Sequence, residues 1–397
     1  MKNRFMRILP TSDESNALWK DILDFCGKTL PETTVGLERQ GTMSDGDSPE
    51  FYRRLGQAGW IGCHWPKEYG GRGLRHLDTF IVDEALGYAR APLSGYLLSV
   101  KVFGNTLLLF GTEEQKREYL PKIASGEVTF CQGFSEPGAG SDFGSLRTVA
   151  RREGDEFVIS GHKIWTSSAE VAQCMYLAAR TDPDAPKHRG ISTFVMDMNL
   201  PGVTVNTFPT LGGGVLNEVF LDSVRIPAKN LIGELNRGFH QSMRSLDLER
   251  SAMDRIGSAW RALDDLAAYV QRDDVLVDGR PLKEQQCVRE KIAELYSRLR
   301  AARLFGYQLA RHLDADRAPS ADFSYGKLFI GLLLQAVADA TMEIIGPLAQ
   351  FEHGAELAPY GGLPASLYRA CPALTLAGGS SEIQKSVIAV RGLGLPK

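Results

Sequence analysis

Apolar residues recur three and four positions apart in the first part of the chain, as on one face of an α-helix. Leu18, Ile22 and Phe25 follow this spacing. Residues 112–115, Thr-Glu-Glu-Gln, have the pattern of a capping box, in which two side chains satisfy backbone N–H groups at a helix start. We predict a helical domain over residues 1–125.

Short runs of β-branched and aromatic residues, separated by Gly, Pro and Asp, take over in the middle of the chain. Runs of this kind lie at 157–159, 191–195, 203–205 and 219–221. Such runs are typical of β-strands. We predict a domain of antiparallel strands over residues 126–237.

Helical spacing returns after Gly238 and continues to the end of the chain. Leu246, Met253 and Ile256 follow one another at helical intervals, and residues 328–345 form a long apolar segment. We predict a helical domain over residues 238–397, which makes the chain an α+β protein of three parts.

Length and composition are those of an ordinary globular protein. At about 150 residues per domain, 397 residues correspond to roughly two to three domains. Forty-five Lys and Arg against 48 Asp and Glu leave a net charge of −3, so we expect no nucleic-acid partner. We see no apolar run near the roughly 18 residues of a membrane span, and no secretory signal.

The cysteines and histidines do not form a recognisable metal or disulfide pattern. The six cysteines include no Cys-x-x-Cys pair, which argues against a disulfide framework and favours the reducing cytoplasm. The seven histidines include no His-x-x-x-His pair. We therefore expect no catalytic metal.

Two segments combine small, hydroxyl and aromatic residues in a way that suits a flat ligand. Residues 134–142 are Phe-Ser-Glu-Pro-Gly-Ala-Gly-Ser-Asp, in which a ligand can approach the backbone. Residues 161–168 are Gly-His-Lys-Ile-Trp-Thr-Ser-Ser, in which a ring and hydroxyls can form a wall for a ring system. Each segment alone is also consistent with a connecting turn or a structural strand. The chain has no Gly-x-Gly-x-x-Gly between a strand and a helix, so no Rossmann-type cofactor site is expected.

Together the two segments resemble the acyl-CoA dehydrogenase family, whose middle domain contains Thr-Glu-Pro-x-x-Gly-Ser-Asp and then Gly-x-Lys-x-Trp-Ile-Thr. The resemblance continues through residues 224–227, 230–233 and 379–384, and so covers nearly the whole chain. It implies a helical domain, a β domain and a four-helix bundle, usually assembled as a tetramer. It also implies FAD bound without a Rossmann fold.

The resemblance assigns cofactor and substrate roles to individual positions. Ser135 matches the residue beside the flavin pyrimidine, Trp165 the tryptophan packed on the ring, and Ser167 the hydroxyl that donates to the hydride-accepting nitrogen. Ser141 matches a residue that contacts the CoA portion. Other positions that the resemblance places at the cofactor are Phe134, Ser380 and Glu382. Residues 381–384 form a second predicted capping box, at the start of the last helix.

The catalytic base occupies an unusual position in this sequence. In much of the family it is a glutamate near the C terminus, but here Gly378 matches that place and offers only a backbone donor for an oxyanion pocket. A second group in the family carries the base on a neighbouring helix, at the position of Glu249. We predict that Glu249 is the base and assign Arg250 to substrate binding. The alternative is a Glu249 that pairs with an arginine and serves only helix packing.

Two motifs that often hold the flavin across a dimer are altered. The family has Arg-x-x-Phe-Gly with a later Gln, and Gln-Ile-x-Gly-Gly. This chain has Arg272, a longer loop to Gln285, and Glu343 with Gly346. These departures resemble dehydrogenases of sterol side-chain and dicarboxylate breakdown, some of which pair two different subunits. We expect either a homo-oligomer or a heterotetramer.

The resemblance implies FAD-dependent dehydrogenation of an acyl-CoA thioester to the 2,3-enoyl thioester, with electron-transfer flavoprotein as oxidant. A carrier-protein thioester could replace CoA. Two alternatives stay open: a catalytically idle subunit that stabilises a partner dehydrogenase, and a flavin oxidase or monooxygenase on the same scaffold.

Overall fold

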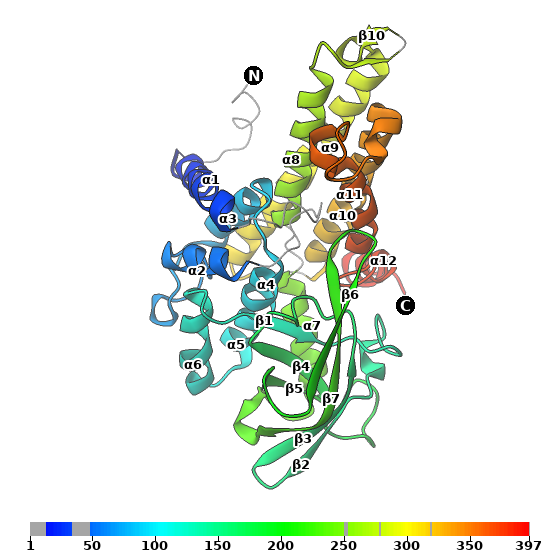
Figure 1. Cartoon of the computed structure of the whole chain (residues 1–397). Coiled ribbons are helices and arrows are strands. Elements are labelled where there is room, and N and C mark those ends of the chain that lie inside the picture. Colours follow the sequence, from blue (N-terminus) through cyan, green and yellow to red (C-terminus); the bar gives the residue numbers. More distant parts are fainter. Residues whose placement is uncertain (1–12, 34–47, 250–252, 278, 318–319, 397) are drawn as a thin grey trace.

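The computed structural model describes residues 13–33, 48–249, 253–277, 279–317 and 320–396, without the side chains of residues 31–33, 246–249 and 320. Two helical parts form one body, and a β-sheet domain lies against one end of it (Figure 1). The predicted order of helical, β and helical parts is confirmed.

The N-terminal part is helical, as predicted. Ile22 is fully buried on its helix, and the capping box of Thr112 and Gln115 is present, with both reciprocal hydrogen bonds. The elements of this part are α1 (Asp13–Thr33), α2 (Pro49–Gln57), α3 (His76–Tyr88), α4 (Ser94–Tyr96), a π-helical segment (Leu97–Gly104), α5 (Asn105–Phe110) and α6 (Glu113–Ala124).

Helix α3 joins the N-terminal part to the C-terminal part. Its residues 79–87 are all buried, and it packs against α8 (Met253–Val270) and α9 (Gln286–Asp314). Two glycines permit the close approach. A Cβ on Gly87 would lie 1.8 Å from the Asp254 carbonyl oxygen, and one on Gly257 would lie 2.0 Å from the Glu84 carbonyl oxygen.

The middle part is a sheet of eight strands within the described residues. Its central strands are buried on both faces, because one face packs on the helices and the other encloses a separate apolar core. The strands are β1 (Phe130–Gly133), β2 (Val149–Glu153), β3 (Glu156–Lys163), β4 (Cys174–Arg180), β5 (Ile191–Asp197), β6 (Val203–Pro209), β7 (Val215–Pro227) and β8 (Leu231–Ile232).

The sheet is not wholly antiparallel, which corrects the prediction. The neighbour order is β6-β7-β3-β2-β4-β5-β8, and β1 also pairs with β4. The ladders of β4 with β1 and with β2 are parallel, and the others in this sheet are antiparallel. Parallel neighbours need a long connection, and the β2–β3 hairpin lies within the connection from β1 to β4.

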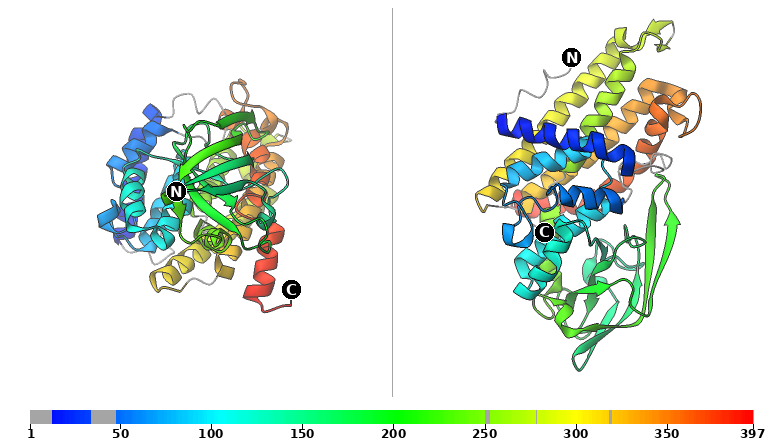
Figure 2. Two further views of the ribbon diagram at one scale, coloured as in Figure 1. Left: turned by 90° about the horizontal axis from the view of Figure 1, so that it is seen from below. Right: turned by 60° about the vertical axis from the view of Figure 1, so that its left-hand side comes forward.

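The C-terminal part is the predicted helical bundle. Helices α8, α9 and α10 (Ser320–Ile345) pack on one another, and α11 (Leu363–Ala370) and α12 (Ser381–Val387) lie against α10. A small hairpin of β9 (Leu276–Val277) and β10 (Arg280–Pro281) connects α8 to α9 at the end farthest from the sheet (Figure 1). The side view shows the long β6–β7 hairpin extending from the sheet toward the bundle (Figure 2), where Arg369 Nε donates to the Leu211 carbonyl at 2.9 Å.

Helix α7 (Gly238–Glu249) lies where the three parts meet. It packs against the π-helical segment and α5 of the N-terminal part, against β5 of the sheet and against α10 of the bundle. The predicted stripe from Leu246 to Met253 crosses residues 250–252, which lie outside the described part of the chain; α7 is described as far as Glu249 and α8 from Met253.

Helix α10 corrects the expectation that no segment is apolar enough to span a membrane. An 18-residue window within Ala321–Gln350 has a mean hydropathy of 1.7 and passes on length and composition, but 56% of that window is buried inside the protein. Its apolar character has a local cause, since α8, α9, α11 and α12 cover it on several sides. This is the environment of a core helix.

Candidate active site

The two segments singled out in the sequence lie side by side. Residues 134–142 follow β1, and residues 164–168 follow β3. The N–H of Ile164 donates to the Ser135 carbonyl at 2.9 Å. Ser135 and Trp165 are therefore neighbours in space, as the predicted cofactor roles require.

A buried ion pair fixes the first segment to the end of β3. Lys163 Nζ donates to Glu136 Oε1 at 2.8 Å, and Lys163 is fully buried. The N–H groups of Arg147 and Thr148 donate to the same carboxylate at 2.6 and 2.9 Å. Burial opposes the charge of Glu136, but Lys163 and these hydrogen bonds lower its pKa on balance. Burial lowers the pKa of Lys163 to about 8, against the opposing effect of Glu136.

The Lys163 pair is a feature that sequence reasoning missed. Its signal is the alternation along β3, since Lys163 falls on the same face as the buried Phe157 and Ile159. A lysine on the buried face of a strand requires an acidic partner.

Trp165 is held rigidly and yet left uncovered. It has φ of +60°, and the next residue, Thr166, exchanges two hydrogen bonds with the fully buried Asn217: Thr166 N to Asn217 O at 3.0 Å, and Asn217 Nδ2 to Thr166 O at 2.9 Å. The indole is 58% exposed and contacts Phe208 edge-on. A fixed, exposed aromatic face is suited to stacking on a planar ligand.

The residues on either side of Ser135 fit the flavin that the resemblance implies. Gln132 of β1 has a buried Nε2 that makes no hydrogen bond among the described residues, so it is available to a bound acceptor. Phe134 is buried, while Ser135 and Ser167 are partly exposed. Gly138 and Gly140 of the adjoining turn are exposed, with open space where a Cβ would be. Neither Gln132 nor Asn217 was predicted.

The turn ends at a charged surface. Ser141 is exposed, and Asp142 beside it pairs with Lys187 and accepts a hydrogen bond from Ser145 at 2.5 Å. These hydrogen bonds lower the pKa of Asp142. The arrangement leaves Ser141 accessible to the polar part of a ligand.

The loop before α12 contains two glycines in the left-handed region. Gly378 has φ of +66° and Gly379 of +92°, which residues other than glycine adopt only with strain.

Ser380 is the N-cap of α12, and its hydroxyl accepts from Ile383 N at 3.4 Å. The predicted capping box at 381–384 is therefore wrong by one residue. The amide of Gln384 instead donates to the carbonyls of Gly378 and Gly379, at 3.2 and 3.1 Å. Glu382 is exposed on α12, and its pKa is lowered mainly by hydrogen bonds from its own N–H and from Ser380.

The predicted base lies at the C-terminal end of α7. Glu249 is its last residue, and its side chain lies outside the described part of the chain, as does Arg250. The backbone position nevertheless places Glu249 on the helix that contacts all three parts of the molecule.

Four predicted cofactor residues are not brought to Trp165 within one chain. Arg272 and Gln285 flank the β9–β10 hairpin at the far end of the bundle (Figure 1), where Arg272 pairs with Asp274 at 2.5 Å. Glu343 is exposed near the end of α10, and Gly346 follows with φ of +70°. Contacts from these residues to a flavin at Trp165 would have to come from another subunit.

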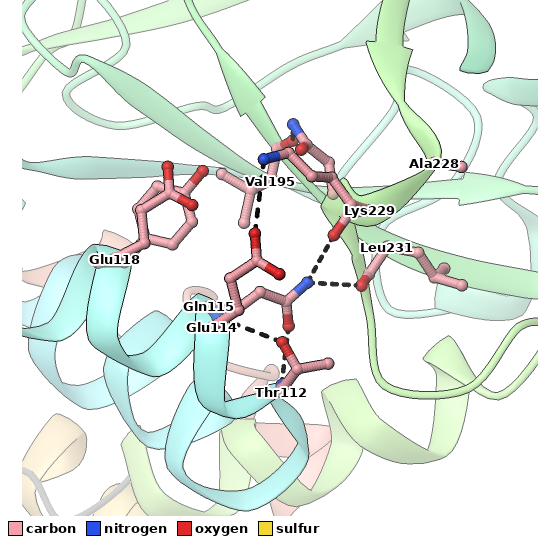
Figure 3. Close-up of a pocket in the computed structure, with 10 residues that line it drawn as sticks. Thr112, Glu114, Gln115, Glu118, Val195, Ala228, Lys229 and Leu231 are labelled. Carbon is pink, nitrogen blue, oxygen red and sulfur yellow. Dashed lines mark hydrogen bonds and ion pairs between the residues drawn. The ribbon is translucent and has the colours of Figure 1, made fainter. Parts of the chain in front are cut away.

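A hollow between α6 and residues 228–231 lies apart from this site (Figure 3). Its volume is about 200 Å³. Gln115 Nε2 donates there to the carbonyls of Lys229 and Leu231, at 2.8 and 2.9 Å. Its polar groups thus join the N-terminal part to the sheet. Among the residues that the structure describes, no cluster of three His, Cys, Asp or Glu side chains could hold a metal ion, and none of the six cysteines forms a disulfide.

Comparison with known proteins agrees with the geometry. The chain matches the acyl-CoA dehydrogenase N-terminal domain over residues 12–127, the middle domain over 131–224 and the C-terminal domain over 236–393. It is 33% identical to the acyl-CoA dehydrogenase FadE26 of Mycobacterium tuberculosis over 354 residues, 88% of each chain.

Two solved structures share the whole fold. A structure titled Tcur3481-Tcur3483 steroid ACAD is 32% identical, with a TM-score of 0.89 over 98% of this chain and 99% of that one. The ChsE4-ChsE5 complex from Mycobacterium tuberculosis is 31% identical, with the same TM-score and coverage. The chain belongs to the acyl-CoA dehydrogenase family of FAD-binding oxidoreductases.

Proposed function

We propose that the protein dehydrogenates an acyl-CoA thioester to the 2,3-enoyl thioester, with Glu249 as the catalytic base. The observation that carries this proposal is that, of the two positions where the base could lie, one holds a glycine and the other holds an acid. The C-terminal loop has Gly378, in a left-handed conformation, where a carboxylate is usual. An acid is instead available at the end of α7, the helix in contact with all three parts of the molecule.

We assign flavin binding to residues 134–142 and 164–168, the two segments joined by the hydrogen bond between Ile164 and Ser135. Trp165 would stack on the ring, while Ser135, Ser167 and the free amide of Gln132 would donate hydrogen bonds to its polar edge. Bound FAD supplies the acceptor for the hydride that leaves the third carbon of the acyl group.

The chain's own residues handle the proton and the developing charge. The Glu249 carboxylate takes the proton from the carbon next to the thioester, and the electron pair of that C–H bond becomes part of the new double bond. N–H groups of the loop at Gly378 stabilise the charge on the thioester oxygen. Ser141 and Arg250 would contact the substrate, with Ser141 on the CoA side.

The two electrons removed from the substrate must leave the protein, and we assign electron-transfer flavoprotein as the acceptor. We place the reaction in the cytoplasm. A carrier-protein thioester is the other form of substrate that the same chemistry would accept.

We further propose that the protein acts with a second, different subunit. Arg272 is expected to hold a flavin across the subunit interface, but its guanidinium forms an ion pair with Asp274. Glu343 stands where the family has an amide. A partner chain would supply these contacts to the flavin at Trp165. The relatives titled as the Tcur3481-Tcur3483 steroid ACAD and the ChsE4-ChsE5 complex support this arrangement.

The test is anaerobic titration of the purified yellow protein with straight, branched, dicarboxylic and steroidal thioesters. We expect bleaching of the flavin by at least one of them, together with a product two hydrogens lighter. The titration is repeated with each neighbouring-gene homologue of the same family coexpressed as partner. A flavin that no thioester bleaches under either condition would reject the proposed reaction.

The alternative is a catalytically idle subunit, favoured by Gly378 and by the pairing of Arg272 with Asp274. If the chain is such a subunit, it should stay colourless with added FAD. Its Trp165 site should also bind no flavin when the chain is in complex with its partner. Loss of flavin on Trp165→Ala in the complex would exclude it.

A further inference from the structure

Two side chains from different helices hold the loop that carries Gly378. Lys327 of α10 donates from Nζ to the Gly379 carbonyl at 2.5 Å. Gln384 of α12 donates from Nε2 to the carbonyls of Gly378 and Gly379. Lys327 is 8% exposed and Gln384 is fully buried. Both donors therefore act on the loop from within the protein.

These hydrogen bonds fix the direction of the loop's N–H groups. A trans peptide is planar, and its carbonyl and N–H point in opposite directions; the described chain contains no cis peptide. The carbonyls of Gly378 and Gly379 point toward Lys327 and Gln384, so the N–H groups of Gly379 and Ser380 point away from them. The two peptides that follow Gly378 are thus fixed, which also restrains the position of the Gly378 N–H, the donor assigned to the oxyanion pocket, at the start of the same loop.

A loop of two left-handed glycines needs such restraint. Glycine has the largest backbone freedom of any residue, and ordering it costs more free energy than ordering other residues. A donor stabilises an oxyanion efficiently only if it is already in place when the charge develops. In this chain the loop has lost the larger side chain that the family usually has at this position, and Lys327 and Gln384 supply the restraint.

We propose that Lys327 and Gln384 are positioning residues, which hold the Gly378–Gly379 loop in the conformation that presents its N–H groups to the thioester oxygen. The inference rests on the proposed function, because it assigns the loop to the thioester. Neither residue touches the substrate. Both act through the loop, so their removal should lower turnover more than it weakens substrate binding.

The test compares Lys327→Met and Gln384→Met with the control Lys385→Met. The control removes an exposed lysine of α12, the helix that carries Gln384. The first readout is amide hydrogen exchange in the peptide covering residues 376–381. We expect exchange at least about tenfold faster in the first two variants and unchanged in the control, because the loop then opens more often. Equal protection in all three proteins would overturn the proposal.

The second readout separates kcat from KM. We expect kcat to fall by about 10- to 100-fold with KM within about threefold, as for a displaced oxyanion donor. Lys327→Arg, which keeps a donor for Gly379, should recover most of the activity and also covers the case in which Lys327→Met does not fold. An unchanged kcat in Gln384→Met despite faster exchange would refute the assignment to catalysis. If the parent protein oxidises no thioester, the proposed function fails, while hydrogen exchange still decides whether the two side chains restrain the loop.

Discussion

Trp165 combines a costly backbone conformation with an exposed ring. A φ of +60° in a bulky residue costs of order 1–3 kcal/mol, and only a compensating role justifies it. The ring buries little within the chain, since 58% of the residue is exposed. We attribute the strain to the placement of the indole face against the flavin.

This account predicts opposite effects of Trp165→Gly on folding and on binding. The free energy of unfolding of the flavin-free protein should be unchanged or rise by up to about 1 kcal/mol, because glycine relieves the strain. The dissociation constant of FAD, measured by flavin fluorescence, should rise by at least about tenfold. Trp65→Ala is the contrast, since Trp65 is fully buried and its loss should cost about 3–5 kcal/mol. A comparable destabilisation by Trp165→Gly would contradict the account.

Glu136 gives the turn before Ser141 a dependence on pH. Its pKa is lowered in the folded protein, so its contribution to stability is present above its unfolded pKa and is lost as the pH falls through the folded pKa. Glu136→Gln should therefore cost about 3 kcal/mol of unfolding free energy at pH 7 and less at about pH 3.5, which lies below the ordinary carboxyl pKa of 4.5. Urea unfolding at both pH values measures this difference. A cost that is the same at both values would show that the charge of Glu136 is unimportant.

At the scale of the element, the contact between α3 and α8 depends on the absence of side chains. Gly87→Ala would place a Cβ 1.8 Å from the Asp254 carbonyl, which neither backbone can accept without moving. We expect a loss of about 3 kcal/mol or more in the free energy of unfolding. Gly27→Ala is the matched control, because Gly27 is exposed on α1 with open space around it. It should raise stability by about 0.5–1 kcal/mol. Equal effects of the two changes would refute the packing argument.

Elements were predictable where the signal is local. The capping box of Thr112 and Gln115 involves only four consecutive residues, and it is confirmed. The same spacing at 381–384 gave a wrong prediction of a capping box. The Gln384 amide donates instead to carbonyls of the preceding loop, and no four-residue pattern reports that contact.

The site was predictable where motifs stand close in the folded chain, and not where contacts cross the whole molecule. The neighbourhood of Ser135 and Trp165 follows from two strands of one sheet. The distance of Arg272 from that neighbourhood follows from the length of α8, which no local pattern reports. The buried Lys163 and the free amide of Gln132 depend on which strand face is covered, and that emerges only with the complete sheet.

At the scale of the whole molecule, a buried ion pair joins the two helical parts. Glu84 of α3 is fully buried and accepts two hydrogen bonds from Arg303 of α9, at 2.6 and 3.0 Å. Tyr307 donates to the same carboxylate at 2.7 Å, and the Arg303 guanidinium lies over the Trp260 ring. The N-terminal and C-terminal helices should therefore unfold as one unit.

Glu84→Gln should lower the free energy of unfolding by about 3 kcal/mol or more, because it leaves the buried Arg303 without its counter-charge. Urea unfolding followed by tryptophan fluorescence and by circular dichroism should still give one coincident transition. The comparison is Arg225→Gln, which removes an exposed pair with Glu153 and should cost less than about 0.5 kcal/mol. Two separate helical transitions in the parent protein would contradict the single unit.

The central claim is that α7, and not the C-terminal loop, supplies the group that removes the substrate proton. The most direct measurement is the rate of flavin bleaching in a single anaerobic turnover, for the parent protein, Glu249→Gln and the exposed control Glu234→Gln. We predict that Glu249→Gln retains its flavin and binds the thioester but bleaches at least about a hundredfold more slowly, within the range expected for loss of a general base. Glu234→Gln should match the parent protein. Bleaching of Glu249→Gln at the parent rate would contradict the claim.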